Sequence, residues 1–350
     1  MKKISLFSLI SLLGICVACQ GIEIPPSATS TSPIGTATSS TIGTATRSAI
    51  GTATNTIGPE ADSTPGNDPS STIAFYSHRD GNLEIYLMDA DGSEQRRVTS
   101  GEYDDDSPAL SPDGSQIAFI SNRNDPNPGA CSHSCFYQLY IVNADGSAER
   151  GLIETEFSTT HPDWHPDGTR ISFDTETNLQ GDIYVVDADG GNLQLLIEDG
   201  FWADWSPDGQ QIVFASQREG SVELYLANAD GSNQRRLTQN GKMEYFPDWS
   251  PDGQRIAYTV LQDRAIYVID VDGGNEGRVT RQAFAENPSW SPDGNWIAYQ
   301  SDDDGDFEIY AINVAEALAG EAGSTPIKLT DNHVGDLWPS WGLNAELGVE

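Results

Sequence analysis

Apolar and polar residues alternate along this chain in short runs that return at a nearly constant interval. Runs such as 117–119 (Ile-Ala-Phe) and 256–258 (Ile-Ala-Tyr) are closely followed by Gly, Pro, Asn or Asp. Short runs of β-branched and aromatic residues, bounded by turn formers, are typical of β-strands. The pattern therefore predicts an all-β protein.

One nine-residue phrase marks the interval. It reads SPDGSQIAF from Ser111, and near copies begin at His165, Ser206, Ser250 and Ser291. In each copy Pro presets φ for the first central position of a turn, Asp suits the second, and Gly takes the positive φ that follows. We therefore interpret the repeated carboxylates as turn formers rather than general acids or metal ligands.

Each unit supplies four predicted strands, named A to D in chain order. The A strand ends in Pro-x-Trp or a substitute, B resembles Ile-Ala-Phe, C contains Ile-Tyr, and D is a short Leu-Thr or Val-Thr segment. We expect B strands to begin at Ile73, Ile117, Ile171, Ile212, Ile256 and Ile297, C strands to centre on Tyr86, Tyr140, Tyr184, Tyr225, Tyr267 and Tyr310, and A strands to end at Leu110, Trp164, Trp205, Trp249, Trp290 and Trp341.

The two ends of the repeat region are complementary. The first unit has no A strand before it, and the last A strand, residues 339–341, has no B strand after it. A period of about 41–54 residues with four strands per unit is that of a propeller. We predict a six-bladed β-propeller over residues 71–345, closed by pairing of the C-terminal A strand with the N-terminal B, C and D strands.

The phrase Pro-x-Trp-Ser-Pro-Asp-Gly-x-x-Ile-Ala-Phe, with RDGNLEIY at residues 79–86, resembles the TolB-like, WD-repeat-like propeller family. The resemblance covers residues 72–341. TolB itself has a separate α/β domain before its propeller and is soluble in the periplasm. Here a tether precedes the repeats, so the TolB role in the Tol–Pal envelope system is not carried over.

The N-terminus has the pattern of an export signal. Lys2 and Lys3 precede an apolar stretch that is too short to span a bilayer and ends in Cys16-Val17-Ala18-Cys19. Small residues before a Cys resemble a lipobox, although Cys16 replaces the usual Leu. We predict a lipoprotein signal peptide at 1–18, lipidation of Cys19 and a flexible Thr/Ser/Gly-rich tether over 19–70; an ordinary secretory signal is the alternative.

Charge limits the partners. Cleavage before Cys19 would remove Lys2 and Lys3 and no acid, which leaves 16 basic and 53 acidic residues, a net charge of −37. Such a surface repels phosphate backbones and anionic lipids, so we expect no nucleic-acid binding and membrane contact through the lipid anchor only. The charge also favours solubility, and we expect an exported monomer facing the extracytoplasmic side.

The A–B and C–D turns share one face, whereas the D–A and B–C loops lie on the other, where the repeats differ from one another. Specificity is therefore expected on this irregular face, around the channel mouth. The candidate ligand-binding residues are Asp106, His161, Trp202, Glu244, Phe246, Glu286, Asn287, Asp336 and Trp338. Aromatic faces beside carboxylates suit a peptide, a cationic partner or a sugar. Alternatively, Trp202, Phe246 and Trp338 wedge between blades.

Three further features of the sequence could bind a metal ion or form a disulfide. His161 and His333 are weak metal candidates on the irregular face, without a tight ligand spacing. Cys131 and Cys135, in the long B–C loop of the second unit, are predicted to form a disulfide. The acidic run 302–306 resembles a calcium loop but aligns with the ordinary B–C turn at residues 79–81, and it lacks the bidentate Glu of an EF-hand.

The sequence has no nucleophile elbow, P-loop or dinucleotide fingerprint. Our hypothesis is a non-catalytic, envelope-anchored binding or scaffolding propeller without a cofactor, which recognises an envelope or extracellular protein, a peptide or a glycan. Two alternatives remain. One is a metal-dependent polysaccharide lyase at the channel mouth, and the other is a structural module stabilised by Ca²⁺.

Overall fold

The computed structural model of the chain describes residue 65 and residues 70–126, 135–175, 181–281, 284–320 and 325–345. The expected signal peptide, Cys19 and nearly all of the tether lie outside these residues. In the part that is described, no helix is long and apolar enough to cross a membrane.

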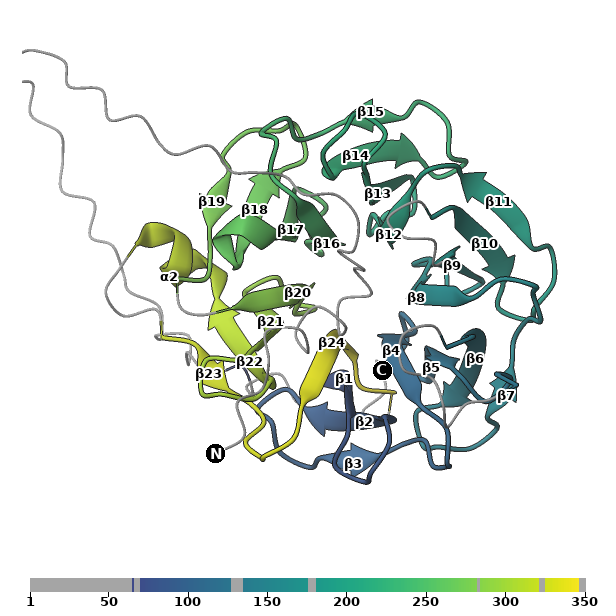
Figure 1. Ribbon diagram of the computed structural model, residues 1–350. Helices are drawn as coiled ribbons and strands as arrows, with labels where there is room; N and C mark the ends of the chain where they lie inside the picture. Colours follow the sequence, from purple (N-terminus) through teal and green to yellow (C-terminus); the bar gives the residue numbers. More distant parts are fainter. Residues whose placement is uncertain are drawn as a thin grey trace, which may run out of the picture. The chain divides into compact units, whose positions relative to one another are not determined.

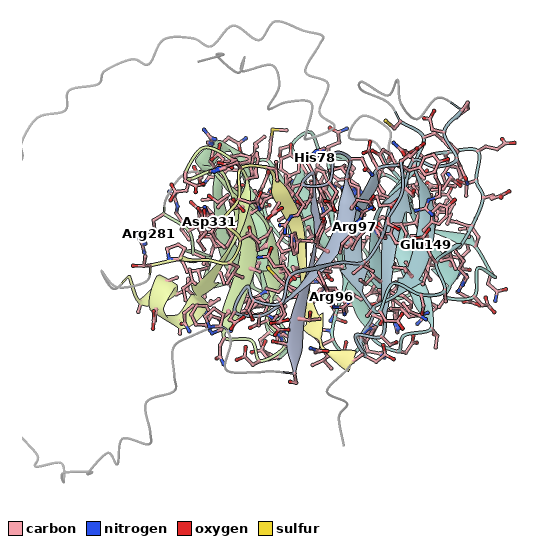
Figure 2. The ribbon with its side chains drawn as sticks, turned by 90° about the horizontal axis from the view of Figure 1, so that it is seen from below. His78, Arg96, Arg97, Glu149, Arg281 and Asp331 are labelled. Carbon is pink, nitrogen blue, oxygen red and sulfur yellow. The ribbon has the colours of Figure 1, made fainter. Side chains whose placement is uncertain are left out.

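Six four-stranded antiparallel sheets surround a central axis (Figure 1). Closure follows the sequence prediction: β24 (Asp336–Leu343) pairs with β1 (Ser71–Ser77), with Ile73 opposite Trp341. Trp341 also donates its indole N–H to Oγ of Ser71 at 3.3 Å. The two ends of the repeat region therefore share blade 1, and the predicted six-bladed propeller is confirmed.

Each blade places its A strand innermost and its B strand next to it. The remaining A strands are β4 (Asp105–Leu110), β8 (Thr159–Trp164), β12 (Phe201–Trp205), β16 (Glu244–Trp249) and β20 (Ala285–Trp290). The remaining B strands are β5 (Gln116–Ser121), β9 (Arg170–Thr175), β13 (Gln211–Ser216), β17 (Arg255–Val260) and β21 (Trp296–Ser301). Blades 2 to 6 begin with β4, β8, β12, β16 and β20, respectively.

The C and D strands form the outer half of each blade. The C strands are β2 (Glu84–Asp89), β6 (Gln138–Asn143), β10 (Ile183–Asp187), β14 (Glu223–Asn228), β18 (Ala265–Asp270) and β22 (Glu308–Asn313). The D strands are β3 (Arg96–Arg97), β7 (Arg150–Gly151), β11 (Gln194–Ile197), β15 (Arg235–Arg236), β19 (Gly277–Arg278) and β23 (Ile327–Lys328).

The D strands correct one expectation. Where Leu-Thr or Val-Thr occurs, it follows the strand instead of forming it, and the Thr hydroxyl accepts a hydrogen bond from the C strand. Thr99 Oγ1, for example, accepts from the N–H of Ile85 at 2.9 Å, and Thr238 Oγ1 accepts from Leu224 at the same distance. At this point the Thr hydroxyl, instead of a backbone carbonyl, accepts the hydrogen bond from the C-strand N–H. The D strand therefore ends before the Thr.

Two short helices were not predicted. A 3₁₀ turn, η2 (Leu261–Asp263), connects β17 to β18, and α2 (Val314–Ala319) replaces the C–D turn of blade 6. The N-cap Asn313 accepts from the N–H of Glu316 at 3.2 Å, and Gly320 ends the helix at φ 69°. An Asn N-cap and a Gly just after the last turn are ordinary helix boundaries, so the signal was present in the sequence.

The repeated turn is stabilised as its residue types suggest. In blade 4, Asp208 Oδ1 accepts from the hydroxyl of Ser206 at 2.7 Å and from the N–H of Gln210 at 3.0 Å. Gly209 has φ 66°, which a residue with a Cβ adopts only at a cost. These carboxylates are consequently occupied by local hydrogen bonds.

The Pro-x-Trp tryptophans pack between blades. Trp205 is only 4% exposed and belongs to a buried cluster with Ile183 and Val185 of blade 3 and Ile212 of its own blade. Trp164, Trp249, Trp290 and Trp341 are likewise buried. The Pro-x-Trp tryptophans therefore contribute to the packing between blades. Trp202, earlier in the A strand of blade 4, also contacts Tyr245 of the next blade, with ring centroids 4.6 Å apart.

Candidate functional site

Every A strand contains one non-glycine residue in the left-handed region of the Ramachandran plot. These six residues occupy equivalent positions and have φ between 47° and 57°: Ser107, His161, Trp202, Phe246, Asn287 and Trp338. Such a backbone conformation is unfavourable for residues with a Cβ, and repeated strain of this kind is found at functional sites. The sequence alone does not show it.

The strain coincides with a β-bulge. The pairing between β8 and β9 shifts register between Thr160 and Asp163, and the corresponding shift occurs in the other blades. A bulge inserts an extra residue and re-aims a side chain. All six bulge residues line a cavity of about 120 Å³. The A strands that carry these residues surround the centre of the ring (Figure 1).

Four of the six side chains carry rings, and these rings meet one another across the channel. The Trp202 and Phe246 centroids are 4.4 Å apart, Phe246 and Trp338 are 5.3 Å apart, and His161 stacks on Trp338 at 5.5 Å. We call His161, Trp202, Phe246 and Trp338 the ring cluster. Ser107 and Asn287 complete the circle with smaller polar side chains, so the cavity has both apolar and polar walls.

His161 is held by hydrogen bonds at both ring nitrogens. Nε2 accepts from the indole N–H of Trp202 at 3.2 Å, which requires the proton of a neutral imidazole to be on Nδ1. Nδ1 then donates to Oδ2 of Asp174 at 3.1 Å. Neither nitrogen offers a lone pair to a metal in this arrangement. Within the described residues, no group of three or more His, Cys, Asp or Glu side chains is placed to hold a metal ion.

A second layer of side chains lies behind the ring cluster and was missed from the sequence. Each comes from the fourth residue of the Ile-Ala-Phe strand: Tyr76, Asp174, Thr259 and Gln300. Gln300 Oε1 accepts from the backbone N–H of Trp338 at 2.8 Å, and Thr259 Oγ1 accepts from that of Asn287 at 3.2 Å. These bonds fix strained backbone at the bulges. The residue that directly follows the nine-residue phrase differs in every blade. This variation within a regular repeat was the sequence signal that could have pointed to the second layer.

Three oxygens of this region are buried without a hydrogen-bond partner in the described structure: Oδ1 of Asp174, Oε2 of Glu286 and Oδ1 of Asn287. Their residues are no more than 4% exposed. Buried acceptors of this kind cost free energy unless a donor reaches them. Only Asn287 among the three lines the channel cavity.

The carboxylates predicted for the rim do not line this cavity. Glu244 and Asp336 are fully buried: Glu244 binds Thr238 and Asn240, while Asp336 pairs with Arg79 at 2.6 Å. They lie at the first residue of their A strands, where they face the blade instead of the channel. The expected rim of mixed aromatics and acids is therefore mainly aromatic.

Asp106 and Glu286 directly precede bulge residues. Asp106 accepts from the hydroxyl of Ser107 at 3.0 Å, and burial raises its pKa to about 6. Burial likewise raises the pKa of Glu286 to about 8, against the effect of a 2.9 Å hydrogen bond from Gln300. Both carboxyls flank the site but do not contact the cavity.

A belt of polar side chains is formed by the residues that stand two positions after the bulge residues. Asp163, Asp204, Asp248, Ser289 and Ser340 come from the middle residue of Pro-x-Trp or its substitute, and all line the cavity. Each accepts a hydrogen bond from the backbone N–H that ends the next A strand; Asp204 accepts from Trp249 at 2.6 Å and Asp248 accepts from Trp290 at 2.7 Å. Ala109 holds the sixth position and has no side-chain acceptor, although its carbonyl oxygen accepts from the indole N–H of Trp164 at 3.1 Å.

The belt carboxyls have raised pKa values. Burial is the main cause for Asp163, Asp204 and Asp248, and the charges of Asp163 and Asp248 add to it for Asp204, which lies between them. The belt joins neighbouring blades and gives the inner channel an acidic lining.

The other predicted chemistry falls outside this site. His333 is exposed in the loop after β23, and Asp302 and Asp304 of the acidic run pair with Arg264 and Lys328. Cys131 lies outside the described residues, so its disulfide with Cys135 stays a prediction.

Comparison with known proteins gives the following similarities. The model of the family described as TolB beta propeller domain matches residues 201–263 and 242–328. An uncharacterized protein of Agrobacterium fabrum is 31% identical over 128 residues, covering 34% of this chain and 40% of that protein. A Protein TolB homolog of Chlorobium luteolum is 32% identical over 153 residues, covering 35% of each chain.

The matched regions thus span less than half the length of these curated relatives. Among solved structures, TolB from Acinetobacter baumannii superposes with a TM-score of 0.63 at 21% identity, over 79% of this chain and 67% of that one. At that identity the superposition supports the fold only. The family model, the curated relatives and the repeated Ser-Pro-Asp-Gly phrase together support a propeller of the TolB-like family.

Proposed function

We propose that this chain is a non-catalytic binding propeller whose ligand inserts an apolar or aromatic side chain against the ring cluster at the channel mouth. The observation that carries the proposal is the set of six strained bulges, which converge on one cavity and bring three aromatic rings and an imidazole together. Backbone strain at six equivalent positions costs free energy of folding. A ligand that binds the surface formed by the strained residues would explain why the strain is kept.

The chemistry favours a protein or peptide. Stacked and edge-on rings offer large apolar contact, while Asn287 and Ser107 offer hydrogen-bonding groups beside them. This mixture of an apolar patch and a few polar groups is common in sites that select an orientation. A glycan, which stacks on the same kind of surface, is the second ligand class that the proposal covers.

Similarity to TolB homologues is consistent with a protein partner in the cell envelope, and the predicted lipidated Cys19 would hold the propeller there as a monomer. Radiolabelled palmitate in growing cells checks the anchor. The full chain should become labelled, and the Cys19→Ala variant should not. Label in both proteins would contradict the anchor without affecting the binding site.

The binding proposal is tested with a displayed library of random peptides selected on the full-length protein in detergent. Wild type should enrich peptides that contain Trp, Phe, Tyr or Leu, and the Trp202→Ala plus Trp338→Ala variant should not enrich them. Leu193→Ala is the matched control, because Leu193 is 41% exposed next to the outer strand β11. Enrichment of the same peptides on the double variant would refute the site.

A further inference from the structure

Each of the six blades has a pair of neighbouring aromatic rings on its B and C strands, and in three blades an arginine covers the pair. In blade 1 the guanidinium carbon of Arg79 lies 4.5 Å from the ring centre of Tyr86, which stacks on Phe75. Arg123 lies 4.4 Å from Tyr140 in blade 2, and Arg218 lies 5.1 Å from Tyr225 in blade 4. The B–C loop supplies the arginine each time.

The arginine is bound in a consistent way. Nε of Arg79, Arg123 and Arg218 donates to the Ser that ends the B strand, at 2.9, 2.7 and 2.8 Å, respectively. One terminal nitrogen reaches the residue before the D strand, which is Gln95, Glu149 or Gln234. The two rings, the Ser hydroxyl and the side chain before the D strand enclose the space that the guanidinium occupies. We call this space the guanidinium niche.

Blades 3 and 5 cover their pairs with a different side chain. Phe157 lies 5.1 Å from Tyr184 in blade 3, and the ammonium of Lys242 lies 5.3 Å from the ring centre of Tyr267 in blade 5. Both come from the D–A loop. An apolar or cationic group from the chain itself therefore sits on the pair in five blades.

Blade 6 differs at three positions of the niche. Tyr299 and Tyr310 still stack, at 5.9 Å and 22°, and Ser301 still ends the B strand. Asp303, however, stands two residues after Ser301, where Arg79 follows Ser77. Pro326 stands where Gln95 precedes the D strand, and Ala285 begins the A strand in the place of Asp105 and Asp336.

These replacements leave space over the pair. A cavity of about 90 Å³ is lined by Tyr299, Tyr310, Ser301, Asp303, Pro326 and Ala285, together with two threonines. No residue of the channel cavity contributes to it. In the described part of the chain no cation lies over these two rings, and no ion pair engages the exposed carboxylate of Asp303.

We infer that blade 6 holds an open guanidinium niche, which binds a guanidinium group supplied by another molecule. The rings offer the cation–π face and Ser301 the hydroxyl that the other blades use, while Asp303 adds a negative charge at the rim. A planar cation stacks on aromatic faces and pairs with a carboxylate at the same time, which an ammonium does less well. The inference does not rest on the proposed function of the channel.

Guanidinium groups reach such a niche from two sources, a free metabolite or an arginine side chain of a peptide. Isothermal titration calorimetry of the full-length protein with methylguanidine, L-arginine and N-acetyl-arginine amide separates them, at constant ionic strength. We expect methylguanidine to bind with a Kd of about 1–10 mM, as suits so small a ligand. Tighter binding of the blocked amide indicates the side chain, and tighter binding of free arginine indicates the metabolite.

Two variants and one control decide the inference. Asp303→Arg should fill the niche from within, abolish binding of all three ligands and raise the melting temperature by about 2–4 °C. Asp303→Asn should weaken binding several-fold. Glu154→Arg, which makes the same charge change as Asp303→Arg at an exposed site in another loop, should leave binding unchanged. Absence of methylguanidine binding to the wild type, or unchanged binding to Asp303→Arg, would overturn the proposal.

Discussion

Trp202 donates its indole N–H to Nε2 of His161 at 3.2 Å, and the same indole packs against Phe246. One side chain thus holds a neighbouring blade's imidazole in a single tautomer and forms part of the ring cluster. The two roles are separable by substitution, because Phe keeps a ring and removes only the donor.

We therefore expect Trp202→Phe to lower the free energy of unfolding by about 1 kcal/mol, the net value of a hydrogen bond. Trp202→Ala should cost more but less than the about 3–5 kcal/mol of a fully buried Trp, because Trp202 is half-buried. Urea unfolding of both variants measures the difference. An undiminished free energy of unfolding in Trp202→Phe would show that the hydrogen bond to His161 contributes nothing, and equal losses in the two variants would show that the ring itself contributes nothing.

The belt of A-strand side chains suggests a substitution that should stabilise the folded protein. Ala109 is the one member without a side-chain acceptor for the next A strand, whereas Ser340 accepts from the N–H of Leu110 at 3.1 Å. Ala109→Ser should therefore stabilise the protein by about 0.5–1.5 kcal/mol, and Ser340→Ala should destabilise it by a similar amount. Thermal unfolding in one buffer compares them. A destabilised Ala109→Ser variant would mean that the seam between blades 2 and 3 has no room for a hydroxyl.

Raised carboxyl pKa values predict how stability depends on pH. Burial raises the pKa of Glu286 to about 8 and that of Glu244 to about 7, and it also raises those of the belt carboxyls. The folded protein then binds more protons than the unfolded chain between about pH 4 and pH 8, so stability falls as the pH rises through this window.

Denaturant unfolding at pH 5 and pH 8 at constant ionic strength measures this slope. Asp248→Asn plus Glu286→Gln should flatten it, because the amides mimic the protonated acids and keep an oxygen that accepts from Trp290 and Gln300. A wild-type protein that becomes more stable from pH 5 to pH 8 would contradict the prediction, as would an unchanged slope in the double variant.

Ring closure has its own ion pair. Arg79, in the N-terminal part of blade 1, pairs at 2.6 Å with the buried carboxylate of Asp336 in the C-terminal strand β24. Arg79→Met removes the cation and leaves that charge buried. Removing one partner of a fully buried pair costs about 3–5 kcal/mol, and we expect about 2–3 kcal/mol here because Arg79 is 24% exposed.

Asp336→Asn in the Arg79→Met background should recover part of this stability, since it removes the unpaired charge. Arg218→Met is the matched control, because Arg218 occupies the same position over Phe214 and Tyr225 but donates to backbone carbonyls instead of an acid. The free energies of unfolding of the four proteins are compared. A loss in Arg218→Met as large as that in Arg79→Met would assign the effect to ring stacking rather than to the ion pair.

The propeller follows from the sequence because its information is local and repeated. Five copies of a turn that needs Pro, Asp and Gly in order, each followed by a short apolar run, leave little choice of strand position. The unpaired A strand at residues 339–341 then determines closure. The same reasoning located the aromatic residues His161, Trp202, Phe246 and Trp338 at the ends of loops on one face.

Only the tertiary structure shows which residues face the channel. In a regular strand neighbouring side chains point to opposite faces, and a bulge changes this order without a sequence signal of its own. The side chains of Glu244 and Asp336 therefore face the blade. Those of Phe246 and Trp338, two residues later in the same strands, face the channel. The belt depends likewise on distances between blades, and the open niche of blade 6 depends on distances between its strands. The spacing of residues along the chain contains neither.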